Sequence, residues 1–390
     1  MVDSEKYEGI CNGLAEYVET NIIPLYDSFD SGHRREHVRK VIANSLAMTA
    51  GRNVSREMVY TAAAYHDTGL TAGRENHHIE SGKIIRCDAN LHRWFTPEQI
   101  ETVAQAAEDH RASADNRPRS IYGLIVAEAD RDIEPLAIIR RTVQYGLSHY
   151  PELDCEGHWQ RTVEHLNMKY AEGGYMHLWL DDSPNAAGLV ELRSIINDTS
   201  RLRDLFDRSY RRQRVLDFLD RNSIPYTLYN HPPLFTIDEA LEYWKEIRDC
   251  VHCKNLFFRN HKGNRHYLVS FECHKQMDIH SLEHVLHQGK LSFASKERME
   301  RCLGLSPGSV SPLGLINDMD LVGADPKELF ANGHRVKFYL DSDLQKAGSV
   351  SFHPADNMAS VVLKTGDFMH FLELWNGEWE WFCPSGDISG

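Results

Sequence analysis

The sequence has 390 residues, of which 42% are hydrophobic and 26% are charged, a composition typical of folded globular proteins. Its formal net charge of −14 excludes broad, charge-driven binding to nucleic acids, so we expect no DNA partner. No apolar run approaches the roughly 20 residues that span a bilayer, and no apolar signal segment is seen, so we expect no membrane partner. The eight cysteines are scattered, as reduced thiols are, and we expect a cytoplasmic location.

The chain is too long for one ordinary hydrophobic core, so two domains are expected. We place them at residues 1–205 and 206–390, because the sequence pattern changes from helical to mixed after a charged stretch at 201–214. The predicted fold class is multidomain, with an all-α domain followed by an α+β domain that has a central mixed sheet.

Four apolar runs at helical spacing lie in the N-terminal half. The first covers 38–46. The second follows Ser55, a residue type that caps helices, and ends near Gly69. The third opens at Thr96 and Pro97, a cap followed by a first-turn proline, and the fourth covers 121–129. No alternating strand pattern interrupts them, which predicts an all-helical domain.

Histidine and aspartate residues on these helices indicate a metal site. His66 and Asp67 are adjacent at a predicted helix end, His37 lies on an earlier helix, and Asp130 lies on a later one. A divalent metal ion favours mixed imidazole and carboxylate ligands with open positions for water. We therefore predict these four residues as its ligands. Alternatively, the adjacent His66 and Asp67 only satisfy hydrogen-bonding groups at the end of a helix.

This ordered set resembles the HD superfamily of metal-dependent phosphohydrolases over roughly residues 20–180. The resemblance implies attack of metal-activated water on a small phosphorylated substrate. HD proteins often hold a second metal through further histidines, which here could equally be surface residues. Two arginines are candidate phosphate-binding residues, or else surface cations. The further candidates are His77, His78 and His110 as ligands, and Arg111 and Arg131 for phosphate.

Strand-like patterns begin after about residue 224. Glycine lies in the turn between two of them, at Gly263, which predicts a hairpin. A late helix is predicted at 368–374. The predicted strands are 226–229, 256–259, 266–271, 336–340, 349–352 and 360–363.

Several short polar or Gly/Pro-rich segments in this half follow one another in a specific order. They are residues 224–226, 231–233, 235–236, 253–257, 291–295, 303–304, 307–312, 317–318 and 352–354. Together they resemble the YbaK and prolyl-tRNA editing family, which hydrolyses mischarged aminoacyl-tRNA. The resemblance runs from about residue 214 to about residue 375. Within that family it is greatest to free-standing proteins that remove alanine from proline tRNA.

The resemblance implies roles for three side chains. Lys254 would hold a phosphate near the tRNA 3′ end as a point charge. Asn255 would hydrogen-bond the aminoacyl or ribose group. His353 would position the substrate or a water molecule, with or without assistance from the tRNA 2′-hydroxyl. A histidine before a proline can also be a packed loop residue.

The loop from Gly308 to Pro312 is the predicted site of the ester carbonyl. Gly308 permits close approach, Ser309 and Pro312 are predicted to contact the substrate, and Pro312 fixes the exit from the loop. A simple turn glycine is the alternative for Gly308. An aminoacyl ester is already activated, so no cofactor is expected in this domain.

Two further patterns surround Lys254. Cys250 and Cys253 have the spacing of a pair of zinc ligands. Cys273 and His274, the other possible pair, are adjacent in the chain, which is poor geometry for a tetrahedral site. Cys253 is better explained as a buried residue. A tRNA end could dock on a basic cluster here, which could equally be a solvated hairpin face. The cluster comprises Lys254, Arg259, Lys262, Arg265 and Lys275, with His261 and His266.

The leading prediction is a fusion of an HD-type metal hydrolase, residues 1–205, with an aminoacyl-tRNA deacylase, residues 206–390. Its partners would be the 3′ end of an aminoacyl-tRNA, most simply alanine on proline tRNA, and a small phosphorylated substrate. One alternative is a nucleotide or phosphoester hydrolase whose C-terminal half only senses or binds tRNA. Another is a regulatory tRNA-binding module, against which the intact Lys254, Gly308 and His353 argue.

Overall fold

A computed structural model describes residues 7–29, 33–111, 116–234, 237–245, 247, 249–319, 321 and 324–384. The motif residues Phe235 and Thr236 lie outside the described residues. The chain forms two compact units, Met1–Thr142 with Glu156–Leu202, and Val143–Cys155 with Arg203–Gly390. The division falls within helix α10 (Thr199–Arg221), whereas the predicted boundary between functional domains at 205/206 stays a prediction.

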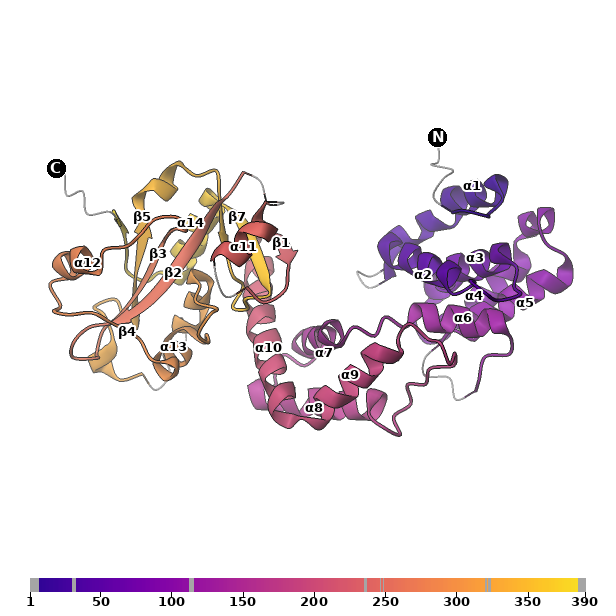
Figure 1. Ribbon diagram of the computed structural model, residues 1–390, viewed down its shortest axis with the longest axis horizontal. Coiled ribbons are helices and arrows are strands. Elements are labelled where there is room, and N and C mark those ends of the chain that lie inside the picture. The colour runs from indigo at the N-terminus through magenta and orange to yellow at the C-terminus, as the bar shows by residue number, and fades with distance from the viewer. Residues whose placement is uncertain are drawn as a thin grey trace. The chain divides into compact units, whose positions relative to one another are not determined.

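Helices make up the regular structure described in the first unit (Figure 1). Ser55 caps α3, because its side chain accepts from the backbone N–H of Met58, and Thr96 and Gln99 form a capping box at the start of α5. The all-α prediction is therefore confirmed. The helices are α1 (Asn12–Asn21), α2 (Arg35–Ala47), α3 (Arg56–Tyr65), α4 (His77–Cys87), α5 (Pro97–Glu108), α6 (Ile121–Asp130), α7 (Pro135–His149), α8 (Cys155–Tyr170) and α9 (Ala186–Asn197).

Helix α3 runs through the core of this unit. Every residue from Met58 to Tyr65 is buried, and the helix packs against α2, α5 and α6. A helix that is apolar on all sides belongs in an interior. Its C-terminal end therefore delivers His66 and Asp67 to a buried position between the neighbouring helices.

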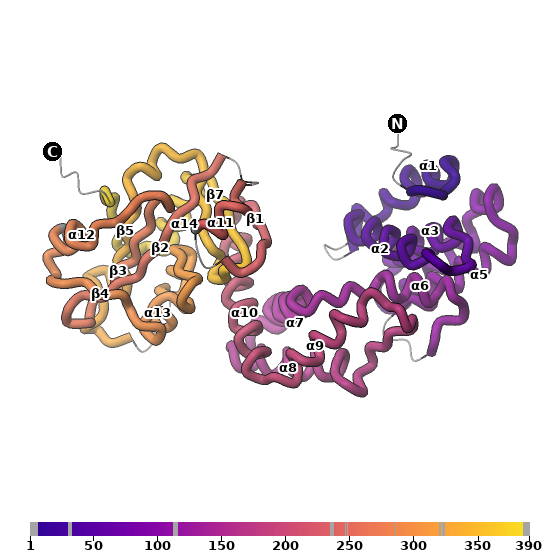
Figure 2. Tube along the Cα trace, viewed as in Figure 1, coloured from indigo at the N-terminus to yellow at the C-terminus, as the bar shows by residue number. Residues whose placement is uncertain are grey.

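One mixed eight-stranded sheet forms the centre of the second unit, which confirms the predicted fold class (Figures 1 and 2). The strand order is β1-β7-β6-β2-β3-β5-β8, and β4 pairs with β2. The parallel pairs are β2–β6, β3–β5 and β5–β8. The strands are β1 (Thr227–Asn230), β2 (Val251–Arg259), β3 (His266–Glu272), β4 (Ser292–Phe293), β5 (Val336–Asp341), β6 (Ser349–Phe352), β7 (Ala359–Lys364) and β8 (Trp379–Phe382).

Different helices pack against the two faces of this sheet. One face forms the larger apolar cluster with α10, α13 (Lys296–Leu303) and α14 (Thr365–Trp375). The other face packs on Leu282 of α12 (Ile279–Leu286). Strand β2 lies inside the sheet, between β6 and β3, so residues along it are held by neighbours on both sides.

The hairpin prediction is confirmed, since β2 and β3 pair antiparallel and Gly263 has a φ of +71° in the turn. The late helix is also confirmed as α14. Strands β4 and β8, and helices α11 (Ile237–Trp244), α12 and α13, were not predicted. No helix within the described ranges is both long and apolar enough to cross a membrane.

Candidate functional sites

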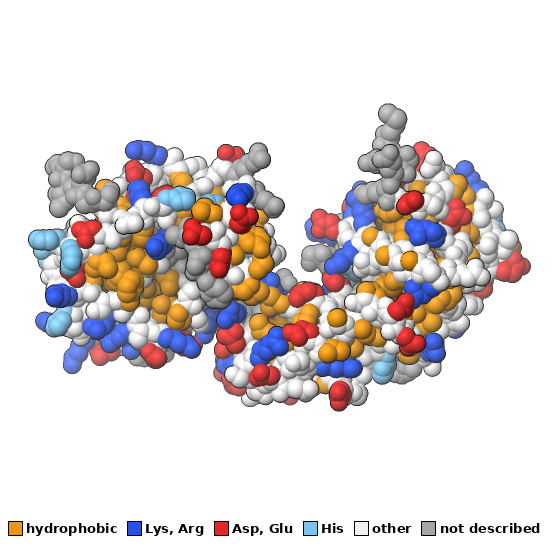
Figure 3. Space-filling model, viewed as in Figure 1, with side chains coloured by type: hydrophobic (Ala, Val, Ile, Leu, Met, Phe, Trp, Pro, Cys, Tyr) orange, Lys and Arg blue, Asp and Glu red, His pale blue; other side chains and the backbone are white. Residues whose placement is uncertain are grey.

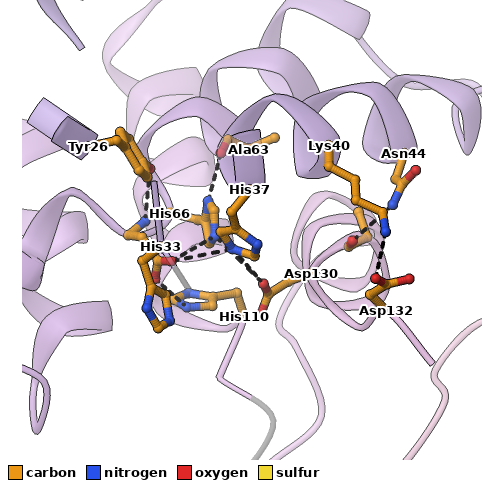
Figure 4. A network of polar contacts seen from close by, with 12 residues as sticks. Tyr26, His33, His37, Lys40, Asn44, Ala63, His66, His110, Asp130 and Asp132 are labelled. Atoms are coloured by element: carbon orange, nitrogen blue, oxygen red, sulfur yellow. Dashed lines mark hydrogen bonds and ion pairs between the residues drawn. The ribbon is translucent and has the colours of Figure 1, made fainter. Parts of the chain in front are cut away.

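Three helices and two turns bring histidine and aspartate side chains together inside the first unit. Figure 4 shows His37, His66, His110 and Asp130 pointing toward one another. His37 comes from α2, and Asp130 is the last residue of α6. His66 directly follows α3, and His110 lies just beyond the end of α5. The cluster has two further members. Asp67 directly follows His66, and His77 is the first residue of α4.

Asp67 lies at the centre of this cluster and uses its two oxygen atoms differently. Its Oδ2 lies 3.6 Å from Nε2 of His37 and 3.2 Å from Nε2 of His66. Its Oδ1 lies 3.4 Å from Nε2 of both His77 and His110. Each oxygen with its pair of imidazoles forms a compact group of potential metal ligands, so one carboxylate joins two groups.

Asp130 completes the first group. Its Oδ1 lies 3.2 Å from Nε2 of His37 and 3.8 Å from Nε2 of His66. Its side chain is 26% exposed, whereas that of Asp67 is 4% exposed, so the cluster is open to solvent on the Asp130 side.

Backbone carbonyls fix the orientation of three of the imidazoles. The Nδ1 atoms of His66, His77 and His110 lie 2.8, 2.8 and 2.6 Å from carbonyl oxygens three residues earlier. A carbonyl only accepts, so each Nδ1 carries a proton and each Nε2 faces into the cluster. Nitrogen atoms that face carboxylate oxygens at these distances need a cation or a proton between them. The donor set therefore fits a divalent metal ion.

The charges of the cluster support the same conclusion. Burial opposes a charge on His37, but the carboxylates of Asp130 and Asp67 more than offset it and raise the pKa of His37 to about 9. Burial likewise opposes ionisation of Asp130, but His37 and the neighbouring imidazoles lower the pKa of Asp130 to about 2. Both carboxylates are thus ionised at neutral pH, because the pKa of Asp67 is also lowered well below its ordinary value against the effect of burial.

Gly69 allows helix α4 to approach the His66–Asp67 turn. A Cβ atom on Gly69 would lie 2.0 Å from the carbonyl oxygen of His77 and 2.6 Å from the backbone nitrogen of Ser81. The N–H of Gly69 donates to Oγ of Ser81 over 2.9 Å. The missing side chain therefore sets the distance between Asp67 and His77.

The remaining predicted residues of this half lie apart from the two ligand groups. His78 is in neither group. Arg111 donates to the carbonyl oxygen of Glu75 over 2.8 Å, and Arg131 is buried beside Glu128 at 3.4 Å. Their roles as ligand and phosphate contacts stay predictions.

Lys169 of α8 was not predicted. Burial and the nearby Arg141 lower its pKa, while the charge of Asp130 raises it. Lys169 has no ion pair within 4 Å in the part of the chain that the structure describes. It lies near enough to Asp130 for the two charges to interact, and a lone lysine on a helix gives no sequence signal for such a position.

A small cavity in the second unit brings together the four predicted catalytic residues, Lys254, Asn255, Gly308 and His353. Its volume is about 230 Å³. Strand β2 supplies the first two residues, and the loops after α13 and β6 supply the others. The other lining residues are Leu234, Ala240, Trp244, Cys253, Cys273 and Val310.

Neighbouring groups orient the polar side chains of the cavity. Asn255 lies opposite Ser270 in the β2–β3 ladder, and the Ser270 hydroxyl donates to Oδ1 of Asn255 over 2.5 Å. Nδ1 of His353 lies 2.9 Å from the carbonyl oxygen of Ala359 and therefore carries the proton. Burial lowers the pKa of His353, so its ring is neutral at neutral pH and offers Nε2 as an acceptor. Lys254 is exposed and has no recorded ion pair in the described segments.

The Gly308 loop differs in part from the expectation. Gly308 has a φ of +86°, the left-handed region that favours glycine, and it lines the cavity. Ser309 and Pro312 do not line it. Both the N–H and the hydroxyl of Ser309 donate to the carbonyl oxygen of Ser306, so that amide is already occupied within the loop. Pro312 is buried at the start of a 3₁₀ helix. Substrate contact by these two residues stays a prediction.

The cysteines near the cavity do not form the zinc-like set that their spacing permits. The group of potential ligands found in this part of the described structure is Glu272, Cys273 and His274, three consecutive residues. Burial raises the pKa of Cys250 to about 11 and of Cys273 to about 12, so both are protonated thiols, a poor form for binding a metal ion.

Comparisons with known proteins agree with these two sites. The aminoacyl-tRNA editing domain family matches residues 231–371, and the HD domain family matches residues 34–133. The prolyl-tRNA editing protein ProX of Acetoanaerobium sticklandii is 36% identical over 156 residues, which are 40% of this chain and 87% of that protein. The chain belongs to the prolyl-tRNA editing family. In this member the editing domain follows an HD domain, and both families are hydrolases.

A mouse relative of the editing domain shows the same relationship. The prolyl-tRNA synthetase associated domain-containing protein 1 of Mus musculus is 31% identical over 147 residues, which are 37% of this chain and 78% of the relative. A crystal structure of a predicted HD superfamily hydrolase from an uncultured Thermotogales bacterium is 18% identical, with a TM-score of 0.32, and covers 57% of this chain and 98% of that one. A likeness this weak says nothing about activity.

Proposed function

We propose that the editing domain hydrolyses mischarged aminoacyl-tRNA, most simply alanine attached to proline tRNA, in the cytoplasm. The observation that carries the proposal is the convergence of Lys254, Asn255, Gly308 and His353 on one cavity from separate parts of the chain. The name of the ProX relative points to the same reaction.

The side chains of the cavity supply binding and orientation rather than a nucleophile. Lys254, which has no carboxylate partner among the residues that the structure describes, would hold a phosphate of the tRNA end. Asn255, with its oxygen occupied by Ser270, would donate its NH₂ group to a carbonyl or ribose oxygen. Neutral His353 would accept a hydrogen bond through Nε2 from the attacking water or the 2′-hydroxyl.

The reaction is the addition of one water molecule to the ester. The water oxygen bonds to the carbonyl carbon, the ester C–O bond breaks, and the ribose oxygen leaves with a proton. Free amino acid and free tRNA are the products. Because the ester is already activated, positioning and stabilisation of the developing oxyanion suffice.

The size of the cavity favours a small amino acid. At about 230 Å³ it must accept the aminoacyl group and part of the ribose, and Trp244, Ala240 and Leu234 close it. Trp244 is held in place by stacking on His252, with ring centroids 4.1 Å apart. A substrate with a large side chain would have to displace this ring.

The test is hydrolysis of alanyl-tRNA for proline by the full chain in the presence of a chelator. We expect turnover to continue without metal and to fall at least tenfold in the Lys254→Ala variant, whose fold should persist because the replaced side chain is exposed. Cys253→Ser is the matched control and should retain activity. Failure to hydrolyse any mischarged tRNA would reject the proposal.

We infer a second activity for the HD domain, a metal-dependent phosphohydrolase acting on a small phosphorylated substrate. The ligands would be His37, His66, Asp67 and Asp130, with His77 and His110 around a second ion. Such ions, when bound, activate water and polarise a phosphoester. Lys169, beside Asp130, would attract the phosphate group to the open side of the cluster.

Metal content decides this second proposal. We expect divalent metal in protein purified without chelators. The Asp67→Ala variant should lose most of this metal. It should also lose any phosphatase activity on nucleotide or generic phosphoester substrates. Replacement of His78 by Ala is the control, because His78 lies outside both ligand groups. Wild-type protein without metal, or an Asp67→Ala variant that keeps it, would show that the ligand set is wrong.

A further inference from the structure

Six cations at one end of strand β2 lack carboxylate partners among the described residues. Arg259 and Arg265 donate to backbone carbonyl oxygens, and Arg298 donates to the carbonyl of Gly263 over 2.6 Å. Three exposed lysines nearby have no recorded ion pair. We call this set the basic edge, and it consists of Arg259, Lys262, Arg265, Lys290, Lys296 and Arg298.

Several other cations of the same domain form ion pairs. Lys275, from the basic cluster expected in the sequence, contacts Asp341 and Asp343 at 2.8 and 2.6 Å. Arg301 contacts Glu328 at 3.0 Å. In a chain with a net charge of −14, a set of cations without ion pairs is a local feature, although Glu283 and Glu297 lie near enough to Lys290 and Lys296 to interact with their charges.

Three separate segments make the basic edge continuous. Strand β4 pairs with β2 at Phe258 and Arg259. A Cβ atom on Gly289 would lie 3.7 Å from Cβ of His261, which places the loop before β4 against the β2–β3 turn. Arg298 of α13 reaches the same turn through Gly263. Figure 3 shows Lys, Arg and His side chains gathered over this end of the domain, around β4 and α13.

Phe293 adds an aromatic surface to this edge. Its ring is 62% exposed and stacks on the buried ring of Phe258, with centroids 4.9 Å apart and an angle of 26° between the planes. A scattered exposed apolar residue needs no explanation. A ring that is supported from below, open above and flanked in the chain by Lys290 and Lys296 has the features of a base-stacking surface.

Arg259 of the basic edge and two residues of the editing cavity share a face of β2. Side chains alternate along a strand, so Cys253, Asn255 and Arg259 project to one side, and Cys253 packs with Phe257 in one apolar cluster. Lys254 and Phe258 project to the opposite side, where Phe258 packs with Leu256. Phe258 lies roughly 13 Å along the strand from Lys254, at about 3.3 Å per residue.

We propose that the basic edge binds the acceptor region of the tRNA whose 3′ end enters the cavity. The cations contact backbone phosphates, and Phe293 stacks on an unpaired base close to the 3′ end. This inference rests on the proposed editing function and extends it to the body of the substrate. The combination of phosphate contacts with one stacking surface suits RNA that has an unpaired end, rather than a uniform duplex.

The test uses the full chain and uncharged proline tRNA, with binding measured over a range of salt concentrations. Lys262→Glu with Lys290→Glu should weaken binding at least tenfold and make it less dependent on salt, because phosphate contacts are lost. Phe293→Ala should weaken binding about tenfold without changing the salt dependence. A charge-matched control, Lys346→Glu with Lys364→Glu, changes exposed lysines elsewhere in the domain and should bind within about twofold of wild type.

Hydrolysis of 3′-alanyl-adenosine separates this inference from the proposed function. The small ester reaches only the cavity, so both basic-edge variants should hydrolyse it at the wild-type rate. Equal tRNA binding by wild type and both variants would overturn the inference, as would equal competition by a DNA duplex as long as the acceptor stem. Loss of tRNA binding in the variants, together with no hydrolysis by wild type, would retain the RNA surface and reject the editing activity.

Discussion

Ser270 decides which end of the Asn255 amide faces the editing cavity. The two residues are directly opposite in the β2–β3 ladder, and Ser270 is fully buried. Its hydroxyl occupies Oδ1 of Asn255, which leaves the NH₂ group for the substrate. A donor at this position matches the carbonyl oxygen of an ester, on which negative charge develops during hydrolysis.

Replacement of Ser270 by Ala should therefore reduce editing without removing a group that touches the substrate. The loss of one oriented hydrogen bond is worth about 1 kcal/mol, which corresponds to roughly a fivefold fall in kcat with little change in KM. Ser270→Thr keeps the hydroxyl and should recover most of the activity. A Ser270→Ala enzyme with normal kcat would show that Asn255 needs no such support.

His353 should give the editing reaction a pH dependence on the acid side. Burial lowers its folded-state pKa below 6.5, so the neutral ring is present above pH 6.5 and is lost as the pH falls through the lowered value. Protonation is easier in the unfolded chain, so the contribution of this group to stability is also lost below pH 6.5. Rates measured with alanyl-tRNA should be flat at and above pH 6.5 and should fall only as the pH passes through the lowered pKa of His353, and His353→Gln should remove that fall.

At the scale of elements, helices were easier to predict than the strand that carries the editing site. Apolar spacing and caps at Ser55 and Thr96 identify helices directly. Strand β2 begins at Val251, but only 256–259 was predicted, because the polar Lys254 and Asn255 interrupt the apolar pattern. The polar candidate site residues thus obscured the first half of the strand on which they lie.

The same reasoning explains which parts of the metal cluster were predictable. The ligand types and their order along the chain indicate a metal site. The residues predicted from them include those that the structure brings together. The choice between His77 and His78 could not be made, because it depends on how α4 packs against the turn at Gly69. Lys169 comes from a distant helix whose sequence has no motif.

Replacement of Gly69 by Ala tests that packing. The new Cβ would overlap the carbonyl oxygen of His77, so α4 must move away from Asp67, and overpacking of this kind costs about 1–3 kcal/mol. We expect a lower unfolding free energy for the HD domain and a reduced metal content. Gly13→Ala is the matched control, because its Cβ would make only ordinary contacts, at 3.7 Å. Equal metal content in the two variants would contradict the role given to Gly69.

At the scale of the whole molecule, two separate apolar cores support two chemistries. One cluster contains residues from Ile10 to Ala129 and surrounds the metal ligands, and another contains residues from Val215 to Trp375 and supports the editing cavity. Units that each bury their own core can fold and act independently. The joined chain therefore predicts two activities that can be removed one at a time.

Reciprocal variants test this independence. Asp67→Ala should remove metal from the HD domain while alanyl-tRNA is hydrolysed at the wild-type rate, because the editing cavity contains no residue of the cluster around Asp67. Lys254→Ala should slow editing and leave metal content unchanged. Both proteins should be assayed with and without a chelator, and the unfolding of each domain should be followed separately. If Asp67→Ala also slowed editing while the second domain stayed folded, the two sites would be coupled. That result would directly support the alternative in which the C-terminal half binds tRNA and senses substrate for the HD domain.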